Sequence, residues 1–177
     1  MTDKEILELA FDSGFTKVAL IDTADIVFYA PYRKACEANY CGNYNSSHSC
    51  PPQCGSPEEM EAKVMAHKKA LVMQLVAEFK DGGDYLASRN THSKLAVKLI
   101  EKLNANGITG GLRVGSSGCD LCEECSFKHG KPCVYPDKMY SCLSAYCIDV
   151  QKLAEKCGMS FGWSKDEIGF YGMYVFD

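Results

Sequence analysis

The sequence predicts an α/β or α+β protein in which one mixed sheet is flanked by helices. Three observations favour this class. Apolar residues at helical spacing alternate with short apolar runs, glycine and proline separate these segments, and two Cys-bearing loops each lie between an expected strand and an expected helix. The 177 residues are 46% hydrophobic and 24% charged, close to globular averages, so we expect a single domain over residues 1–177.

The first half of the chain divides into two helices and two strands. Apolar side chains recur at helical spacing over residues 3–13, and a glycine ends this helix. Residues 17–21 then form a short apolar strand. After the first Cys-bearing loop, Ser56 followed by proline and two glutamates is typical of a helix start, and this helix should run to about Lys68. Residues 70–79 are apolar enough for a buried strand.

The second half repeats much of this order. Residues 81–83 break the chain, and a longer helix follows over residues 85–104 until a glycine terminates it. A strand is expected over residues 108–114, although two glycines interrupt it. The chain then passes through the second Cys-bearing loop to a helix over residues 150–156 and a last strand over residues 170–176. The long helix should turn its apolar side chains inward: Leu86, Leu95, Ala96, Leu99 and Leu103.

Helix, strand, Cys loop, helix and strand thus occur twice in the same order, which suggests half-repeats at residues 1–80 and 84–177 of one mixed sheet. Both loops follow a strand and precede a helix. Connections of this kind carry the ligand sites of open α/β sheets. We therefore expect the two Cys-bearing loops to emerge near one end.

The charge and hydropathy patterns exclude several classes of partner. A formal net charge of −4 offers no basic surface, so neither nucleic acid nor an anionic membrane is an expected partner. No apolar run approaches the roughly 20 residues that a membrane helix requires. The N-terminus is charged from Asp3 onward and lacks the pattern of a secretory signal, so we expect a cytoplasmic protein.

The 11 cysteines are too many for packing alone, and an odd number in a reducing compartment cannot all be paired. The more specific motif lies in the second loop: Cys119-x2-Cys122-x2-Cys125-x7-Cys133. Three thiolates at three-residue steps with a more distant fourth are typical of [4Fe-4S] ligation. Zinc is the alternative, but it usually takes two separate Cys-x2-Cys pairs.

The first loop carries a second motif: Cys36-x4-Cys41-x8-Cys50, then two prolines and Cys54. This loop is rich in Gly, Asn, Ser and Pro, so it can bend its thiolates toward one centre but would bury no core. We expect a second [4Fe-4S] cluster here, with zinc as the alternative and His48 as a substitute ligand. In two-cluster ferredoxins the last Cys of a run can bind the other cluster, so the assignment of Cys50 and Cys133 to their own loops stays open.

Other segments accompany the two motifs: residues 19–27, Asn39, Gly42, Tyr44, Pro51-Pro52, Gly55, Gly118, Glu123, Gly130-Lys131-Pro132, Pro136, Ser144-Ala145-Tyr146 and Ile148-Asp149-Val150. Together with the cysteines they resemble the cysteine-rich family of predicted metal-binding (iron-sulfur) proteins of unknown function. The resemblance covers nearly the whole chain. It implies iron-sulfur binding in a bacterial or archaeal, anaerobic cytoplasm and brings no settled activity.

One departure from that family bears on the chemistry. Many members have an apolar residue where this chain has Cys54, which would leave Cys36, Cys41 and Cys50 as a set of three thiolates. Such a set leaves one iron open to bind a small molecule, as metal catalysis requires. A fourth thiolate from Cys54 would saturate the cluster and favour plain electron transfer.

Three cysteines, Cys142, Cys147 and Cys157, lie beyond both loops. Free cysteines are commonly buried as small hydrophobic residues, so core packing is the first interpretation. The alternative is a dithiol or an extra set of ligands, because Cys142-x4-Cys147 repeats the Cys36-x4-Cys41 interval.

The sequence therefore predicts two [4Fe-4S] clusters, one per loop, that transfer electrons between a redox donor protein and an acceptor protein. The expected ligands are Cys36, Cys41, Cys50, Cys54, Cys119, Cys122, Cys125 and Cys133. Two alternatives stay open. One is an oxidoreductase or sulfur-handling enzyme with an open iron at Cys36, Cys41 and Cys50, and the other is a zinc-binding structural module without redox activity. No set of catalytic side chains stands out at a recognisable spacing.

Overall fold

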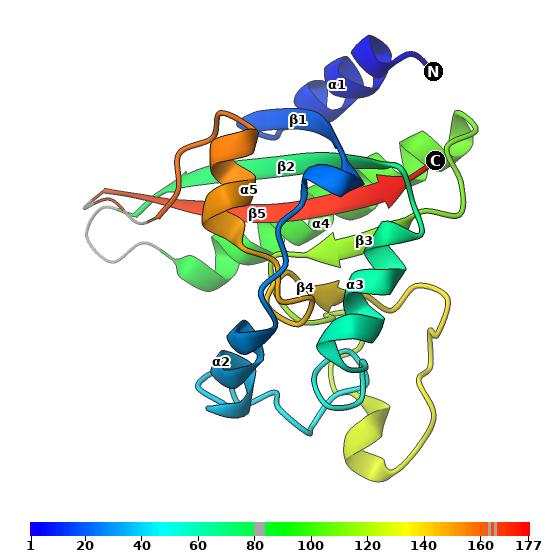
Figure 1. Cartoon of the computed structure of the whole chain (residues 1–177), viewed down its shortest axis with the longest axis vertical. Coiled ribbons are helices and arrows are strands. Elements are labelled where there is room, and N and C mark those ends of the chain that lie inside the picture. The colour runs from blue at the N-terminus through cyan, green and yellow to red at the C-terminus, as the bar shows by residue number, and fades with distance from the viewer. Residues whose placement is uncertain (80–83, 163, 165) are drawn as a thin grey trace.

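The computed structural model describes residues 1–79, 84–162, 164 and 166–177, which form a five-stranded sheet with helices on both faces (Figure 1). The helices are α1 (Asp3–Asp12), α2 (Arg33–Glu37), α3 (Pro57–Met65), α4 (Tyr85–Ala105) and α5 (Val150–Lys156). The strands are β1 (Lys17–Asp22), β2 (Lys69–Glu78), β3 (Leu112–Gly115), β4 (Ser141–Cys142) and β5 (Glu167–Phe176). The predicted mixed, helix-flanked sheet is therefore confirmed, as an α+β fold.

The sheet has the strand order β1-β2-β5-β3-β4. Neighbours from β1 to β3 are antiparallel, whereas β4 pairs with β3 in parallel, so the sheet is mixed. The long strands β2 and β5 form its centre and pair from Lys69 opposite Phe176 to Glu78 opposite Glu167. In this order β5 lies between β2 and β3. The last strand of the chain therefore joins β3 and β4 to the strands of the first half.

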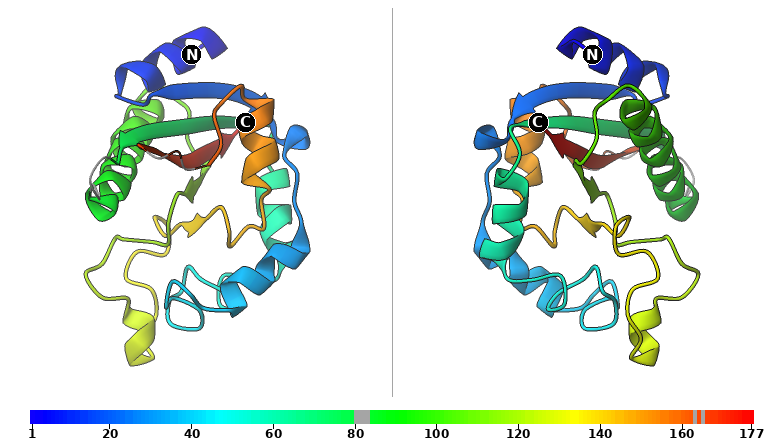
Figure 2. Two further views of the ribbon diagram at one scale, coloured as in Figure 1. Left: turned by 90° about the vertical axis from the view of Figure 1, so that its left-hand side faces the viewer. Right: turned by 90° about the vertical axis from the view of Figure 1, so that its right-hand side faces the viewer.

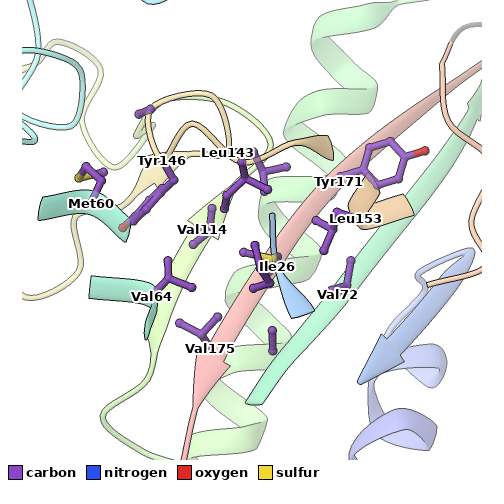
Figure 3. Packing of buried hydrophobic residues seen from close by; sticks show 14 of the residues in the cluster. Ile26, Met60, Val64, Val72, Val114, Leu143, Tyr146, Leu153, Tyr171 and Val175 are labelled. Carbon is purple, nitrogen blue, oxygen red and sulfur yellow. The ribbon is translucent and has the colours of Figure 1, made fainter. Parts of the chain in front are cut away.

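Alternating side chains of the central strands build a separate core on each face of the sheet. Leu71 and Met73 of β2 pack with α1 and α4, whereas Val72 packs with α3 and α5. Figure 2 shows α4 on one side of the sheet and α3 with α5 on the other. Figure 3 shows the second core, in which Val64 of α3 lies beside Val175 and Leu153 of α5 lies beside Val72. No helix among the described residues is long and apolar enough to span a bilayer.

The helix starts follow the capping pattern of the sequence. Ser56 accepts a hydrogen bond from the Glu59 backbone N–H (3.2 Å), and the Glu59 carboxylate accepts one from the Ser56 backbone N–H (2.8 Å). Pro57 occupies the first helical position, where no N–H is needed. Thr2 and Glu5 form the same reciprocal pair at α1. The predicted helix over residues 150–156 has the bounds of α5.

Three predicted boundaries are wrong. The last strand, expected over residues 170–176, begins at Glu167, because β5 pairs with β2 as far as Glu78 opposite Glu167. The strand expected over residues 108–114 begins only at Leu112, because Gly110 adopts a left-handed turn conformation with φ of 73°. The helix expected to reach Lys68 ends at Met65, because the chain then turns into β2, and the Thr23 hydroxyl binds the carbonyl of His67 at 2.5 Å.

One predicted core residue is wrong as well, since Leu86 is 56% exposed. It lies in the first turn of α4, and the buried positions of that helix begin only at His92. The predicted break at residues 81–83 lies outside the described residues. The chain order of helix, strand, loop, helix and strand does occur twice, but a repeat relation between the two halves stays a prediction.

The first Cys loop (residues 36–54) and the second Cys loop (residues 119–133) lie together beyond the β4 edge of the sheet (Figures 1 and 2). Their predicted gathering near one end is thus confirmed, but by an unexpected route. β1 and β3 run antiparallel, so their C-terminal ends point in opposite directions. The chain after β1 crosses toward β4, held by a bridge between Phe28 and Ile148 and by the Tyr29 N–H, which donates to the Cys147 carbonyl at 2.8 Å.

Stability should fall in mild acid because of His92. This α4 side chain is 1% exposed, and burial, assisted by Arg113, lowers its pKa from 6.5 to about 4 despite the Met73 carbonyl beside its ring. Between these two pH values the His92 ring is protonated in the unfolded chain and neutral in the folded chain. The free energy of unfolding should therefore decrease by up to about 3 kcal/mol as the pH falls from 6.5 to 4. Urea denaturation across this range measures the loss.

The control is His92→Gln, which removes the titrating ring. Its stability should depend less steeply on pH over the same interval, whatever its absolute stability. Equal slopes for the two proteins would contradict this account.

Candidate metal centres

The cysteines of the first loop come from different local structures. Cys36 lies in the short helix α2, Cys41 and Cys50 lie in the irregular loop, and Cys54 lies two residues before Ser56, the N-cap of α3. The side chains of Cys36, Cys41 and Cys50 line a cavity of about 680 Å³. Cys54 does not line it; its side chain is 6% exposed and belongs to the hydrophobic core with Met60 and Tyr146. The structure therefore brings three of the four predicted ligands to one cavity.

Cys142 lines the same cavity, although core packing was its first interpretation. It is the last residue of β4 and lies close enough to Cys36, Cys50 and Cys54 to influence the pKa of each thiol. Its environment thus combines partial packing against the core with exposure to the thiol-lined cavity. The interval shared by Cys142-x4-Cys147 and Cys36-x4-Cys41 was the one sequence signal for this placement.

The other two late cysteines behave as expected. Cys147 is 1% exposed and belongs to the core, where its thiol lies 3.8 Å from the Ala30 carbonyl. Cys157 follows α5 and packs against the same core. Burial raises the pKa of Cys157 to about 11. Core packing is therefore confirmed for these two residues.

The second loop gathers its four predicted ligands around another cavity. Cys119, Cys122, Cys125 and Cys133 line a space of about 160 Å³. His48, considered as a ligand of the first group, lines this second cavity instead. Its ring Nε2 lies 2.9 Å from the Lys131 carbonyl oxygen, and the ring packs edge-on against Phe127 with centroids 5.2 Å apart.

Burial favours the protonated form of several of these thiols. It raises the pKa of Cys36 to about 12 and of Cys50 to about 11, and it also raises that of Cys119. Cys125 differs, because backbone N–H groups of His48 and Phe127 and the Ser47 hydroxyl outweigh its burial and lower its pKa. A metal or cluster must therefore displace protons from the buried thiols as it binds.

A buried positive charge lies beside the first group. Arg33 is 9% exposed, and its Nη1 and Nη2 donate to the carbonyls of Gly55 and Ala145, each at 2.8 Å. Among the described residues it forms no ion pair, and its Nε has no hydrogen-bond partner. Against the larger effect of burial, its charge lowers the pKa of Cys36 and Cys54. Because buried charges normally need a counter-charge, this site fits anionic thiolates.

The two loops contact each other directly. The Cys119 backbone N–H donates to the Ser49 hydroxyl at 3.3 Å. Gly118 packs so closely that a Cβ there would lie 3.5 Å from the Cys50 sulfur. Cys119 and Cys122 also line the larger cavity that Cys36 and Cys50 line. The two candidate centres are therefore neighbours.

A polar network fixes the start of the second loop to the sheet. The Tyr140 hydroxyl donates to Asp120 Oδ1 at 2.5 Å, and the Ser93 hydroxyl donates to Asp120 Oδ2 at 2.6 Å. Arg113 of β3 donates to the Ser93 hydroxyl at 2.8 Å, while its guanidinium lies 3.6 Å from the centre of the Tyr140 ring. This network holds Asp120, and thereby the adjacent Cys119, against β3 and α4.

In the part of the chain that the structure describes, no three His, Cys, Asp or Glu side chains converge closely enough to bind a single metal ion. The thiols are instead arranged around the two cavities.

The comparisons with known proteins give one family. A family model described as "Predicted metal-binding protein (DUF2284)" matches residues 19–176. Neither a curated protein nor a solved structure matches the chain. The match supports metal binding and leaves the kind of metal open.

Replacing Tyr140 by Phe should loosen the second loop. The change removes the hydroxyl that donates to Asp120 Oδ1 and accepts from the Asp120 N–H at 3.2 Å, in a side chain that is 2% exposed. We expect a loss of about 1–3 kcal/mol in the free energy of unfolding, measured by urea denaturation. Tyr29→Phe, at a site that is 53% exposed, is the matched control and should change stability by less than about 0.5 kcal/mol. Similar losses in both variants would contradict the role of the network.

Proposed function

The chain belongs to the family of predicted metal-binding proteins whose model spans residues 19–176, and we propose that its two Cys loops hold two [4Fe-4S] clusters for electron transfer between protein partners. Clusters of this kind, when bound, accept and pass on single electrons. The observation that carries the proposal is the placement of two groups of thiols around adjoining cavities on contacting loops. The partners would be a redox donor protein and a redox acceptor protein in a reducing, anaerobic cytoplasm.

The donor set of the second loop supports a cluster. Cys119, Cys122, Cys125 and Cys133 have the ferredoxin-like order of three closely spaced thiolates and a distant fourth, and all four line one cavity. Backbone N–H groups directed at Cys125 favour its thiolate form. Such N–H groups also tune the potential of a bound cluster.

The first loop fits a cluster by space and by charge. Its cavity of about 680 Å³ is far larger than the roughly 30 Å³ that one water molecule occupies in the liquid. The buried, unpaired Arg33 supplies positive charge where thiolates and an anionic cluster need it. Cys36, Cys41 and Cys50 would provide three ligands from this loop.

The contact between the loops favours electron transfer as the function, rather than two separate metal sites with a structural role. A Cys50 sulfur beside Gly118, next to Cys119, places ligands of both centres side by side. The chain directly after the second loop lies at the surface, where Val134 is 59% exposed and Tyr135 is 46% exposed. An electron could therefore enter at one loop and leave from the other without crossing the sheet.

Anaerobic purification with iron, sulfide and zinc analysis tests the proposal. We expect about eight iron and about eight sulfide per chain, together with a brown colour that bleaches on reduction. A folded, colourless protein that contains only zinc, or no metal, would show that the proposal is wrong.

Arg33 should tune the potential of the first centre. Because its buried charge favours the more negative, reduced form of a cluster, Arg33→Met should shift one of two reduction potentials to more negative values, on the order of tens of millivolts. A potentiometric titration followed by electron paramagnetic resonance measures the shift, and Arg33→Lys should restore part of it.

Lys34→Met is the matched control, because Lys34 is exposed on the same helix. Its effect should be much smaller, since exposed charges are screened by water and salt. Equal shifts in the two variants would contradict the role of Arg33.

A further inference from the structure

We propose that Cys142, at the end of β4, is the fourth thiolate ligand of the first centre, in place of Cys54. This inference rests on the proposed function, because it names the residues that hold the first of the two clusters. It joins a thiol from the sheet to three thiols from a loop that lies more than 90 positions earlier in the chain.

The cavity carries the first part of the argument. Cys36, Cys41, Cys50 and Cys142 all line the space of about 680 Å³, and Cys54 does not. Cys54 lies instead among the side chains of the core, in the cluster that contains Met60, Val64 and Tyr146. To reach a cluster in the cavity, Cys54 would have to leave that packing, whereas Cys142 already borders the space.

The elements that supply the four thiols carry the second part. Cys36 comes from α2, Cys41 and Cys50 come from the loop that follows it, and Cys142 comes from the end of β4. Cys142 therefore borders the cavity from the side of the sheet, whereas the three loop thiols border it from the first loop.

The backbone around Cys142 is held on both sides. Cys142 pairs with Gly115 of β3, and the next residue, Leu143, donates its N–H to the Gly115 carbonyl at 3.1 Å. The Ala145 N–H donates to the Cys142 carbonyl at 2.9 Å. The sheet and this turn thus fix the position of Cys142 at the border of the cavity.

The buried Arg33 gives an independent sign that an anion belongs here. Its unpartnered Nε and its lack of an ion pair among the described residues leave the positive charge uncompensated. Arg33 bonds to the Ala145 carbonyl, three residues after Cys142, and to the Gly55 carbonyl, one residue after Cys54. The charge therefore supports an anionic first centre, and the lining of the cavity distinguishes the two thiols.

Ligation by Cys142 has a chemical consequence. The thiol loses its proton to solvent as its sulfur bonds to iron, with no change in oxidation state. Four thiolates then saturate the four irons and leave no open coordination position for a substrate. The first centre would act as an electron carrier even if Cys54 never binds iron.

The test compares Cys142→Ser with Cys54→Ser in the full chain, purified without oxygen. The readouts are iron and sulfide content together with Mössbauer and electron paramagnetic resonance spectra. In Cys142→Ser we expect a fall from about eight to about four iron per chain, or a [3Fe-4S] signal from the first centre. In Cys54→Ser we expect full iron content and only thiolate-ligated iron sites.

Several results would overturn the inference. One is loss of iron in Cys54→Ser but not in Cys142→Ser, and another is full iron with unchanged spectra in both variants. If circular dichroism shows that Cys142→Ser does not fold, the result for Cys54→Ser decides alone. Full iron content with only thiolate-ligated iron sites in Cys54→Ser would support the inference. Loss of iron, or an iron site without a thiolate ligand, would overturn it. If the wild-type protein contains no iron, the proposed function itself is wrong. That result is distinct from the variant results above, which test only the choice of ligand.

Discussion

The parallel pairing of β3 with β4 is the constraint on which both candidate centres depend. It places Gly115 opposite Cys142 at the edge of the sheet. Four residues after the end of β3 the chain reaches Cys119, the first thiol of the second group, while β4 ends in the thiol that borders the first cavity. Parallel neighbours need a crossover of a dozen or more residues. The connection between β3 and β4 meets this need and contains the second Cys loop.

The two centres have different electrostatic surroundings although they are neighbours. The first borders the buried Arg33, whose charge has no ion-pair partner among the described residues. The second is held through Asp120 and lies near the exposed pair of Lys128 and Glu124, whose charged atoms are 3.8 Å apart. Because nearby charge, hydrogen bonds and exposure set cluster potentials, two clusters here would differ in potential. Such a difference gives electron flow a preferred direction.

The sequence predicts the regular elements well where local physics determines them. Capping residues mark the starts of α1 and α3, and the long apolar run of β2 is buried as expected. The sequence does not predict the elements that depend on pairing with distant parts of the chain. β4 has two residues and no periodic pattern, and it exists because β3 lies beside it. The short helix α2 likewise lacks a capping side chain that could have revealed it.

The candidate site shows the same division. The spacing of the cysteines predicts which of them share a loop, and the structure brings the second set of four together. For Cys142 the repeated interval gives only a weak signal and does not show which centre it joins, because its approach to the first loop depends on the sheet edge. One more result of the strand order concerns biosynthesis: β5, the central strand that attaches β3 and β4 to the rest, follows all 11 cysteines in the chain. Every thiol is therefore synthesised before the strand that closes the sheet, so the two thiol-lined cavities can form only when synthesis of the chain is nearly complete.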